Sequence, residues 1–176
     1  MALCEHLNVT SITTIQHDET PSDLADLVEY MFGSPSTTAW GAQRAGDGHP
    51  KAYPTDQYFE IGNEIDTPDF AKKALAMEAA AKQHGVGGKL KYACPWQCLG
   101  SLDTIVSQGA KALGSQVVFD LHTNTPGPAG EFGQWTARLA EPLAKLDKSE
   151  LTDARVGWWG TNTAKLHDMS RAIMEA

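Results

Sequence analysis

Cationic side chains are scarce in this sequence, and long apolar runs are missing from it. The 14 Lys and Arg residues stand against 22 Asp and Glu residues, which gives a formal net charge of -8. Such an acidic chain repels phosphate backbones and anionic membrane surfaces, so we expect neither nucleic acid nor membrane as a partner. No apolar run approaches the ~20 residues of a membrane-spanning helix, and no secretion signal opens the sequence. These absences predict a cytoplasmic protein.

Cysteine is also scarce, with three residues in the chain. Cys94 and Cys98 are separated by three residues, which is not the two-residue spacing of common metal and redox motifs. An odd, small number of cysteines in an acidic cytoplasmic chain predicts reduced, buried thiols. The histidines form neither a His-x-His nor a His-Glu-x-x-His pattern, so we expect no metal site. No cofactor is implied either.

Apolar periodicity and turn residues predict alternating strands and helices in one domain over residues 1–176. Strands are expected over residues 9–15, 57–62, 90–94, 117–121 and 155–159. Helices are expected over residues 1–7, 21–33, 67–83, 101–114, 130–146 and 165–175, with a long loop over 34–56. Five strand-helix units in series predict an α/β fold with a parallel sheet and right-handed crossovers.

A complete eightfold (β/α) barrel needs about 250 residues, and this chain is 176 residues long. Three alternatives remain open. The sheet is open, or the chain is a partial barrel, or two copies complete each other as a homo-oligomer. An incomplete barrel exposes strand edges, which favours pairing.

The run from Tyr58 to Glu64 is the most informative motif of the chain. An apolar strand pattern ends in Asn63 and Glu64, just before a predicted helix. Barrel enzymes hold their catalytic groups at such strand ends, and most glycoside hydrolases use a pair of carboxylates. Glu64 is therefore a candidate proton donor. Its structural alternative is a carboxylate that stabilises the positive end of the following helix. Glu60, on the same strand face, is expected to be a buried structural partner, for example of Arg44.

This run and several upstream positions resemble the α-L-arabinofuranosidases of glycoside hydrolase family 51. The resemblance lies in residues 26–30, Trp40-Gly41, Arg44, Gly48-His49-Pro50, Tyr53 and residues 58–64. It implies a partial TIM barrel that spans the third to seventh strand units. It also implies hydrolysis of terminal α-L-arabinofuranosyl units from plant-cell-wall polysaccharides or oligosaccharides, so that an arabinose-containing saccharide is the expected partner.

The resemblance assigns roles to individual residues. Glu64 corresponds to the general acid/base, and Asn63 to the residue that hydrogen-bonds the sugar 2-hydroxyl. His122 corresponds to a substrate-contacting histidine, although a core histidine is the structural alternative. His49 is a further candidate contact, with a loop-positioning role as its favoured alternative. Among the tryptophans, Trp96 is the best candidate for stacking against a sugar because it follows a strand end.

One position departs from the family pattern. Gly160 occupies the place where the resemblance implies a catalytic glutamate. A retaining hydrolase needs that carboxylate about 5–5.5 Å from the acid, and glycine supplies none. Asp120 and Asp153 are nearby carboxylate candidates that do not match the motif, and a water held by Asp120 would give inverting chemistry, in which the carboxylates stand about 6.5–9.5 Å apart. The alternatives are an engineered or natural loss of the nucleophile, which leaves a catalytically impaired sugar-binding protein or a fragment.

Overall fold

The structure is a computed structural model that describes residues 2–7, 10–63, 65–123, 144, 151 and 155–160. Its sheet contains five strands in the order β1-β2-β3-β4-β5, and every neighbouring pair is parallel. This confirms the predicted parallel α/β fold. The strands are β1 (Ile12–Ile15), β2 (Tyr58–Ile61), β3 (Lys91–Pro95), β4 (Val117–Thr123) and β5 (Arg155–Gly160).

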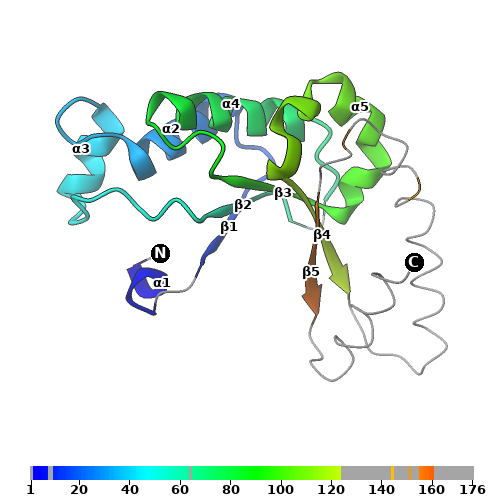
Figure 1. The fold of residues 1–176 in the computed structure, drawn as a ribbon, viewed down its shortest axis with the longest axis horizontal. Helices are drawn as coiled ribbons and strands as arrows, with labels where there is room; N and C mark the ends of the chain where they lie inside the picture. Colours follow the sequence, from blue (N-terminus) through cyan, green and yellow to red (C-terminus); the bar gives the residue numbers. More distant parts are fainter. Residues whose placement is uncertain are drawn as a thin grey trace.

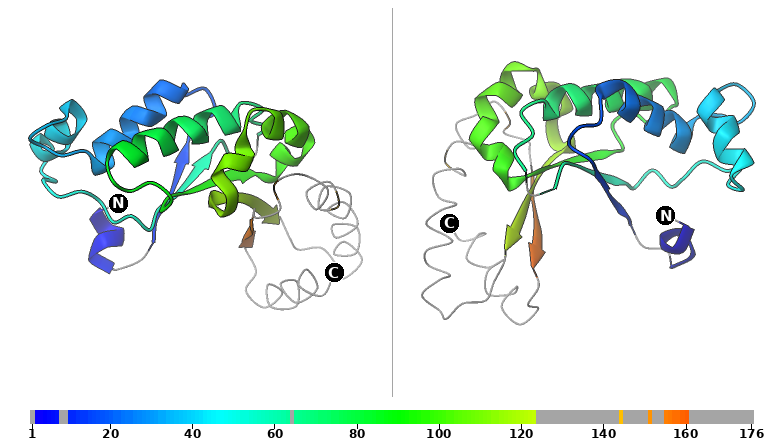
Figure 2. Two further views of the ribbon diagram at one scale, coloured as in Figure 1. Left: turned by 45° about the horizontal axis from the view of Figure 1, so that its top comes forward. Right: turned by 180° about the vertical axis from the view of Figure 1, so that it is seen from behind.

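The helices lie mainly on one face of the sheet (Figure 1). In both views of Figure 2, α2, α4 and α5 cover the same side. A strand order without reversal and helices on a single face are typical of a barrel, whereas a doubly wound sheet reverses its order and is covered on both faces. The helices are α1 (Ala2–Leu7), α2 (Pro21–Phe32), α3 (Ala39–Gly46), α4 (Phe70–Gln83) and α5 (Leu102–Ser107), with 3-10 helices η1 (Trp96–Ser101) and η2 (Ala110–Gln116).

Helix α2 begins and ends where the sequence predicts. The Thr20 hydroxyl accepts a hydrogen bond from the Asp23 amide, and the Asp23 carboxylate accepts one from the Thr20 amide. This reciprocal capping box, with Pro21 in the first turn, defines the start of the helix. The Asp23 carboxylate also accepts a hydrogen bond from the Thr20 hydroxyl at 2.6 Å, and this bond together with the one from the Thr20 amide lowers the pKa of Asp23 from its ordinary value. Helical spacing then buries Leu24, Val28 and Met31 in the hydrophobic core.

Three local predictions are wrong. The expected loop over residues 34–56 contains α3. Its N-cap is Thr38, whose hydroxyl accepts a hydrogen bond from the Gly41 amide. Thr67 does not cap α4, because its hydroxyl donates to the Ile65 carbonyl and the helix begins at Phe70. The expected helix over residues 101–114 is divided into α5 and η2 at Gly109, which has a φ of 95°.

The core lies between the sheet and its helices. Alternate strand residues face the helices, as the period of two requires, and Phe59, Ile61 and Phe119 are fully buried. The alternate positions of β1 and β2 carry polar groups instead. There the Thr14 hydroxyl donates to Glu60 across the two strands at 2.7 Å, and Glu60 is buried as predicted.

A polar network is buried among the core residues around Glu78 of α4. The Tyr92 hydroxyl donates to the Glu78 carboxylate at 3.0 Å, and the Gln116 amide donates to the same oxygen at 2.8 Å. Burial raises the pKa of the Tyr92 phenol well above its ordinary value, and the charge and hydrogen bond of Glu78 raise it further. The network joins α4 to β3 and η2.

Arg44 is fully buried, but its partners are not the predicted ones. Its guanidinium donates to the carbonyl oxygens of Tyr30, Gly33 and His49, at 2.7, 2.9 and 3.0 Å. Two of these carbonyls belong to the carboxyl end of α2, where a cation complements the helix dipole. The expected partnership with Glu60 is therefore wrong, because Arg44 instead joins α3 to the end of α2.

Two expected helices, over residues 130–146 and 165–175, lie outside the described part of the chain apart from residue 144. Within the described residues, no helix combines the length and the apolar character that crossing a membrane requires.

Candidate active site at the carboxyl edge of the sheet

Most of the predicted site residues follow or end strands of the parallel sheet. Asn63 comes two residues after β2, and Trp96 begins η1 directly after β3. His122 is the second-last residue of β4 and pairs with Trp159 of β5. The last pair of the two strands joins Thr123 to Gly160. Because parallel strands end at one edge, the backbone positions of these residues share the edge where barrel enzymes keep their chemistry. Glu64 itself lies outside the described residues.

The chain turns sharply at Gly62, directly after β2 and two residues before the candidate acid/base in the sequence. Gly62 has a φ of 86°, and its amide donates to the Ile15 carbonyl at 3.0 Å. A Cβ atom at this position would lie 2.5 Å from the Thr67 hydroxyl oxygen and 3.3 Å from Ile65. Both the backbone conformation and the lack of space require glycine. The turn leaves Asn63 exposed while Thr67 is buried beneath it.

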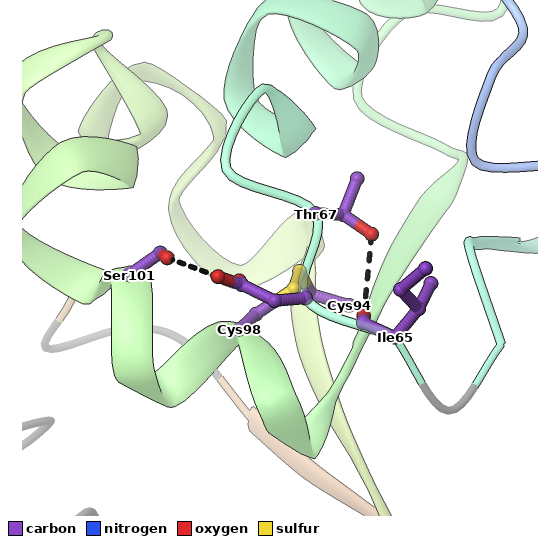
Figure 3. The surroundings of a disulfide bond; sticks show 6 residues. Ile65, Thr67, Cys94, Cys98 and Ser101 are labelled. Carbon is purple, nitrogen blue, oxygen red and sulfur yellow. Dashed lines mark hydrogen bonds between the residues drawn. A yellow bond between two sulfur atoms is a disulfide. The ribbon is translucent and has the colours of Figure 1, made fainter.

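The segment after this turn is bonded to the segment that follows β3. The Ser101 hydroxyl, at the end of η1, donates to the Asp66 carboxylate at 2.7 Å. Within the segment, the Thr67 hydroxyl donates to the Ile65 carbonyl at 3.4 Å (Figure 3). The loops after β2 and β3 are thus joined at the edge that carries Asn63 and Trp96.

The same two elements are joined covalently. Cys94 in β3 and Cys98 in η1 form a disulfide with a Cα–Cα distance of 6.1 Å, and both residues are fully buried (Figure 3). The prediction of reduced thiols is wrong for this pair. Because β3 continues directly into a 3-10 turn, residues four apart come within the range that a disulfide spans. Cys4 is the free cysteine among the described residues.

Lys73 is a structural residue of this edge that sequence reasoning missed. Its ammonium donates to the His17 carbonyl in the loop after β1 and pairs with Asp69 at 3.1 Å. The Lys73 side chain is 2% exposed and that of Asp69 is 43% exposed, so the ammonium of this pair is buried while its carboxylate meets solvent. The sequence did carry one sign that Lys73 is buried: it lies at helical spacing from Phe70 and Met77, which are both on the buried face of α4.

His49 is placed elsewhere, in the connection that leads to the amino end of β2. Its ring stacks on Tyr53 with centroids 4.1 Å apart, and its two nitrogens contact the Lys51 carbonyl and the Glu5 carboxylate. The Tyr53 amide in turn donates to Met31, at the carboxyl end of α2. These contacts favour the loop-positioning alternative, and a substrate contact by His49 stays a prediction.

A family model described as the alpha-L-arabinofuranosidase 1 domain matches residues 2–124. The match includes Asn63, Glu64, Trp96 and His122, and Gly160 lies beyond it. A search of curated proteins finds no match.

In fold, the chain is similar to the crystal structure of an alpha-L-arabinofuranosidase from Thermotoga maritima in an arabinose complex. The TM-score is 0.61 at 14% sequence identity, and the similarity covers 92% of this chain. It covers 37% of that enzyme, so the chain spans just over a third of its length. At this identity the likeness concerns the fold alone, which is that of a partial (β/α) barrel. The family match is more specific: the chain belongs to the alpha-L-arabinofuranosidase 1 domain family.

Proposed function

We propose that this chain carries part of a glycosidase site that acts on terminal α-L-arabinofuranosyl units of plant-cell-wall polysaccharides or oligosaccharides. The observation that carries the proposal is the family match over residues 2–124, which includes the Asn63-Glu64 motif. The shared strand edge of Asn63, Trp96 and His122 supports it, since barrel enzymes build their sites there.

Each residue has a proposed chemical role. Glu64 protonates the glycosidic oxygen of the leaving group, and Asn63 donates a hydrogen bond to the sugar 2-hydroxyl, which strengthens in the transition state. His122 contacts the arabinofuranosyl ring, and Trp96 offers an apolar face for stacking. The exposure of Asn63 beyond the Gly62 turn is compatible with its role.

Gly160 leaves the proposed site without a nucleophile of its own. It ends β5 opposite Thr123 of β4, and it supplies no carboxylate for a covalent glycosyl intermediate. Cleavage of the glycosidic bond is therefore expected to need a small external nucleophile, which forms a new bond to the anomeric carbon as the leaving group departs. Azide is small enough to enter the space of a missing carboxylate and to attack the anomeric carbon directly.

The experiment measures release of the aryl group from an aryl α-L-arabinofuranoside, with and without azide. We expect azide-dependent release from the unaltered protein. With an activated aryl leaving group that needs little protonation, Glu64→Asp and Glu64→Gln should show graded losses, which grow when a less activated leaving group is used. Release without azide would assign the second carboxylate to another residue. No release in either condition, from folded protein, would refute the proposed hydrolase.

Gly160 also favours a second function, saccharide binding without turnover. A site that keeps Asn63 and Trp96 but lacks a nucleophile retains its binding groups. Calorimetric titration with an arabino-oligosaccharide distinguishes this function: binding that weakens in Asn63→Ala, together with no release under azide, would support it. No binding and no release would exclude both functions.

A second copy of the chain is the proposed partner that completes the barrel. In the described part of the sheet, β1 and β5 are the edge strands, and open parallel edges favour pairing. The mass in solution tests this proposal. A dimer that dissociates only on unfolding would support it, and a stable monomer would contradict it.

A further inference from the structure

Two links connect the segment after β3 to the loop that leads from β2. The first is the Cys94–Cys98 disulfide, which ties η1 to the end of β3. The second is the hydrogen bond from Ser101, the last residue of η1, to Asp66. Figure 3 shows both links around the same short helix. Together they run from the buried end of β3, through η1, to the loop over residues 62–69.

Among the side chains that the structure describes, the disulfide and the Ser101–Asp66 hydrogen bond are two interactions that hold η1. Six residues is long for a 3-10 helix, whose hydrogen bonds have poorer geometry than those of an α-helix. Ser101 does not cap α5, because its hydroxyl is directed to Asp66. The disulfide therefore constrains the position of Ser101 from the side of β3, and the buried Leu102 of α5 follows Ser101 directly.

We propose that the Cys94–Cys98 disulfide is a redox-sensitive positioning device for the loop that carries Asn63 and Glu64. While the disulfide is intact, η1 holds Ser101 against Asp66, and the part of the loop around Asp66 keeps one conformation. Reduction releases η1, weakens the Ser101–Asp66 bond and loosens the loop. Ser101 and Asp66 are positioning residues, and the effect on turnover rests on the function proposed above.

The chemical step is a thiol–disulfide exchange with an external dithiol. A thiolate of the dithiol attacks one sulfur of the pair, which breaks the Cys94–Cys98 bond and forms a mixed disulfide. The second thiol of the reagent then displaces the protein sulfur and leaves as a cyclic disulfide. Two electrons and two protons are transferred, and both cysteines become thiols. Because both are fully buried, reduction requires η1 to open.

The first test is amide hydrogen exchange, which does not depend on turnover. Oxidised protein is compared with protein reduced by dithiothreitol, alkylated and desalted, with mass spectrometry counting the modified cysteines. We expect protection in the peptide over residues 62–70 to fall by roughly 10- to 30-fold on reduction, while α2 is unchanged. Unchanged exchange over residues 62–70 would overturn the proposal. A loss of protection of similar size in α2 would also overturn the proposal, since the disulfide would then stabilise the whole fold.

Substitutions separate the two links. Ser101→Ala keeps the disulfide and is expected to loosen the loop, whereas Ser101→Thr keeps the hydroxyl and should restore protection. Cys98→Ser should reproduce the reduced state, and Cys4→Ser, which leaves the disulfide intact, should behave like the unaltered protein. Equal protection in the Ala and Thr variants at position 101 would overturn the role of the hydrogen bond.

Azide-dependent release of the aryl group is measured on the same samples, and we expect it to fall about 10-fold on reduction. The two proposals fail in different ways. Looser exchange with no release in either redox state would sustain the positioning device and refute the hydrolase. Equal release from the oxidised and the reduced protein, with unchanged hydrogen exchange, would support the hydrolase and refute the positioning device.

Discussion

The replacement Gly62→Ala tests how the site loop is directed away from β2. At a φ of 86°, a residue with a Cβ atom costs about 1 kcal/mol. The added Cβ also meets the Thr67 hydroxyl oxygen at 2.5 Å and Ile65 at 3.3 Å. Thr67 is 1% exposed, so it has little room to move, and such overpacking costs about 1–2 kcal/mol more. The expected loss in the free energy of unfolding is about 2–3 kcal/mol.

Gly85→Ala is the matched control. Gly85 has a similar φ of 74°, but a Cβ atom there would meet no heavy atom within 4 Å. Only the conformational cost applies, about 1 kcal/mol. Urea unfolding of both variants measures the difference, which we expect to be about 1–2 kcal/mol at an unchanged slope. Gly62→Ala should also lower azide-dependent release, while Gly85→Ala should not. Equal destabilisation by the two replacements would refute the reasoning about close approach.

Two further predictions concern buried polar groups. Arg44→Met removes three charge-assisted hydrogen bonds to the carbonyls of Tyr30, Gly33 and His49. Urea unfolding should show that the free energy of unfolding falls by about 3–5 kcal/mol. A decrease below about 1 kcal/mol would contradict this role. Tyr92 has a pKa raised above 10.0 by burial and by Glu78, so the folded protein keeps the phenol proton that the unfolded chain releases above about pH 10. Stability should therefore fall by up to about 1.4 kcal/mol per pH unit above pH 10, and this slope should be smaller in Tyr92→Phe; equal slopes would contradict the assignment.

Local chemistry explains why the strands and α2 were predictable. The Thr20 capping box, the proline after it and the apolar spacing of Leu24, Val28 and Met31 all indicate one helix. The strand runs are short, apolar and bounded by turn residues, and their order implies parallel pairing. Helix α3 was missed because it has eight residues, two of them glycine, and only Gly41 and Arg44 are buried, so it has no apolar periodicity.

Long-range partners could not be predicted in the same way. Nothing in the sequence near Arg44 indicates that it binds carbonyls at the end of α2, or that Ser101 binds Asp66 thirty-five residues away. The disulfide depends on β3 passing directly into a 3-10 turn, which the spacing of Cys94 and Cys98 alone does not show. The edge location of Asn63, Trp96 and His122 was predictable because the ends of parallel strands always share an edge.

The most direct test of the central claim is to supply the missing carboxylate. The replacement Gly160→Glu is compared with Gly160→Gln, which has the same shape without the charge, in assays of aryl release without azide. If Gly160 stands at the nucleophile position opposite Glu64, the Glu variant should release the aryl group unaided, and the Gln variant should not. Adding Glu64→Gln to the Glu variant should lower that release. Folded Gly160→Glu protein that releases no more than Gly160→Gln would contradict the assignment of both positions.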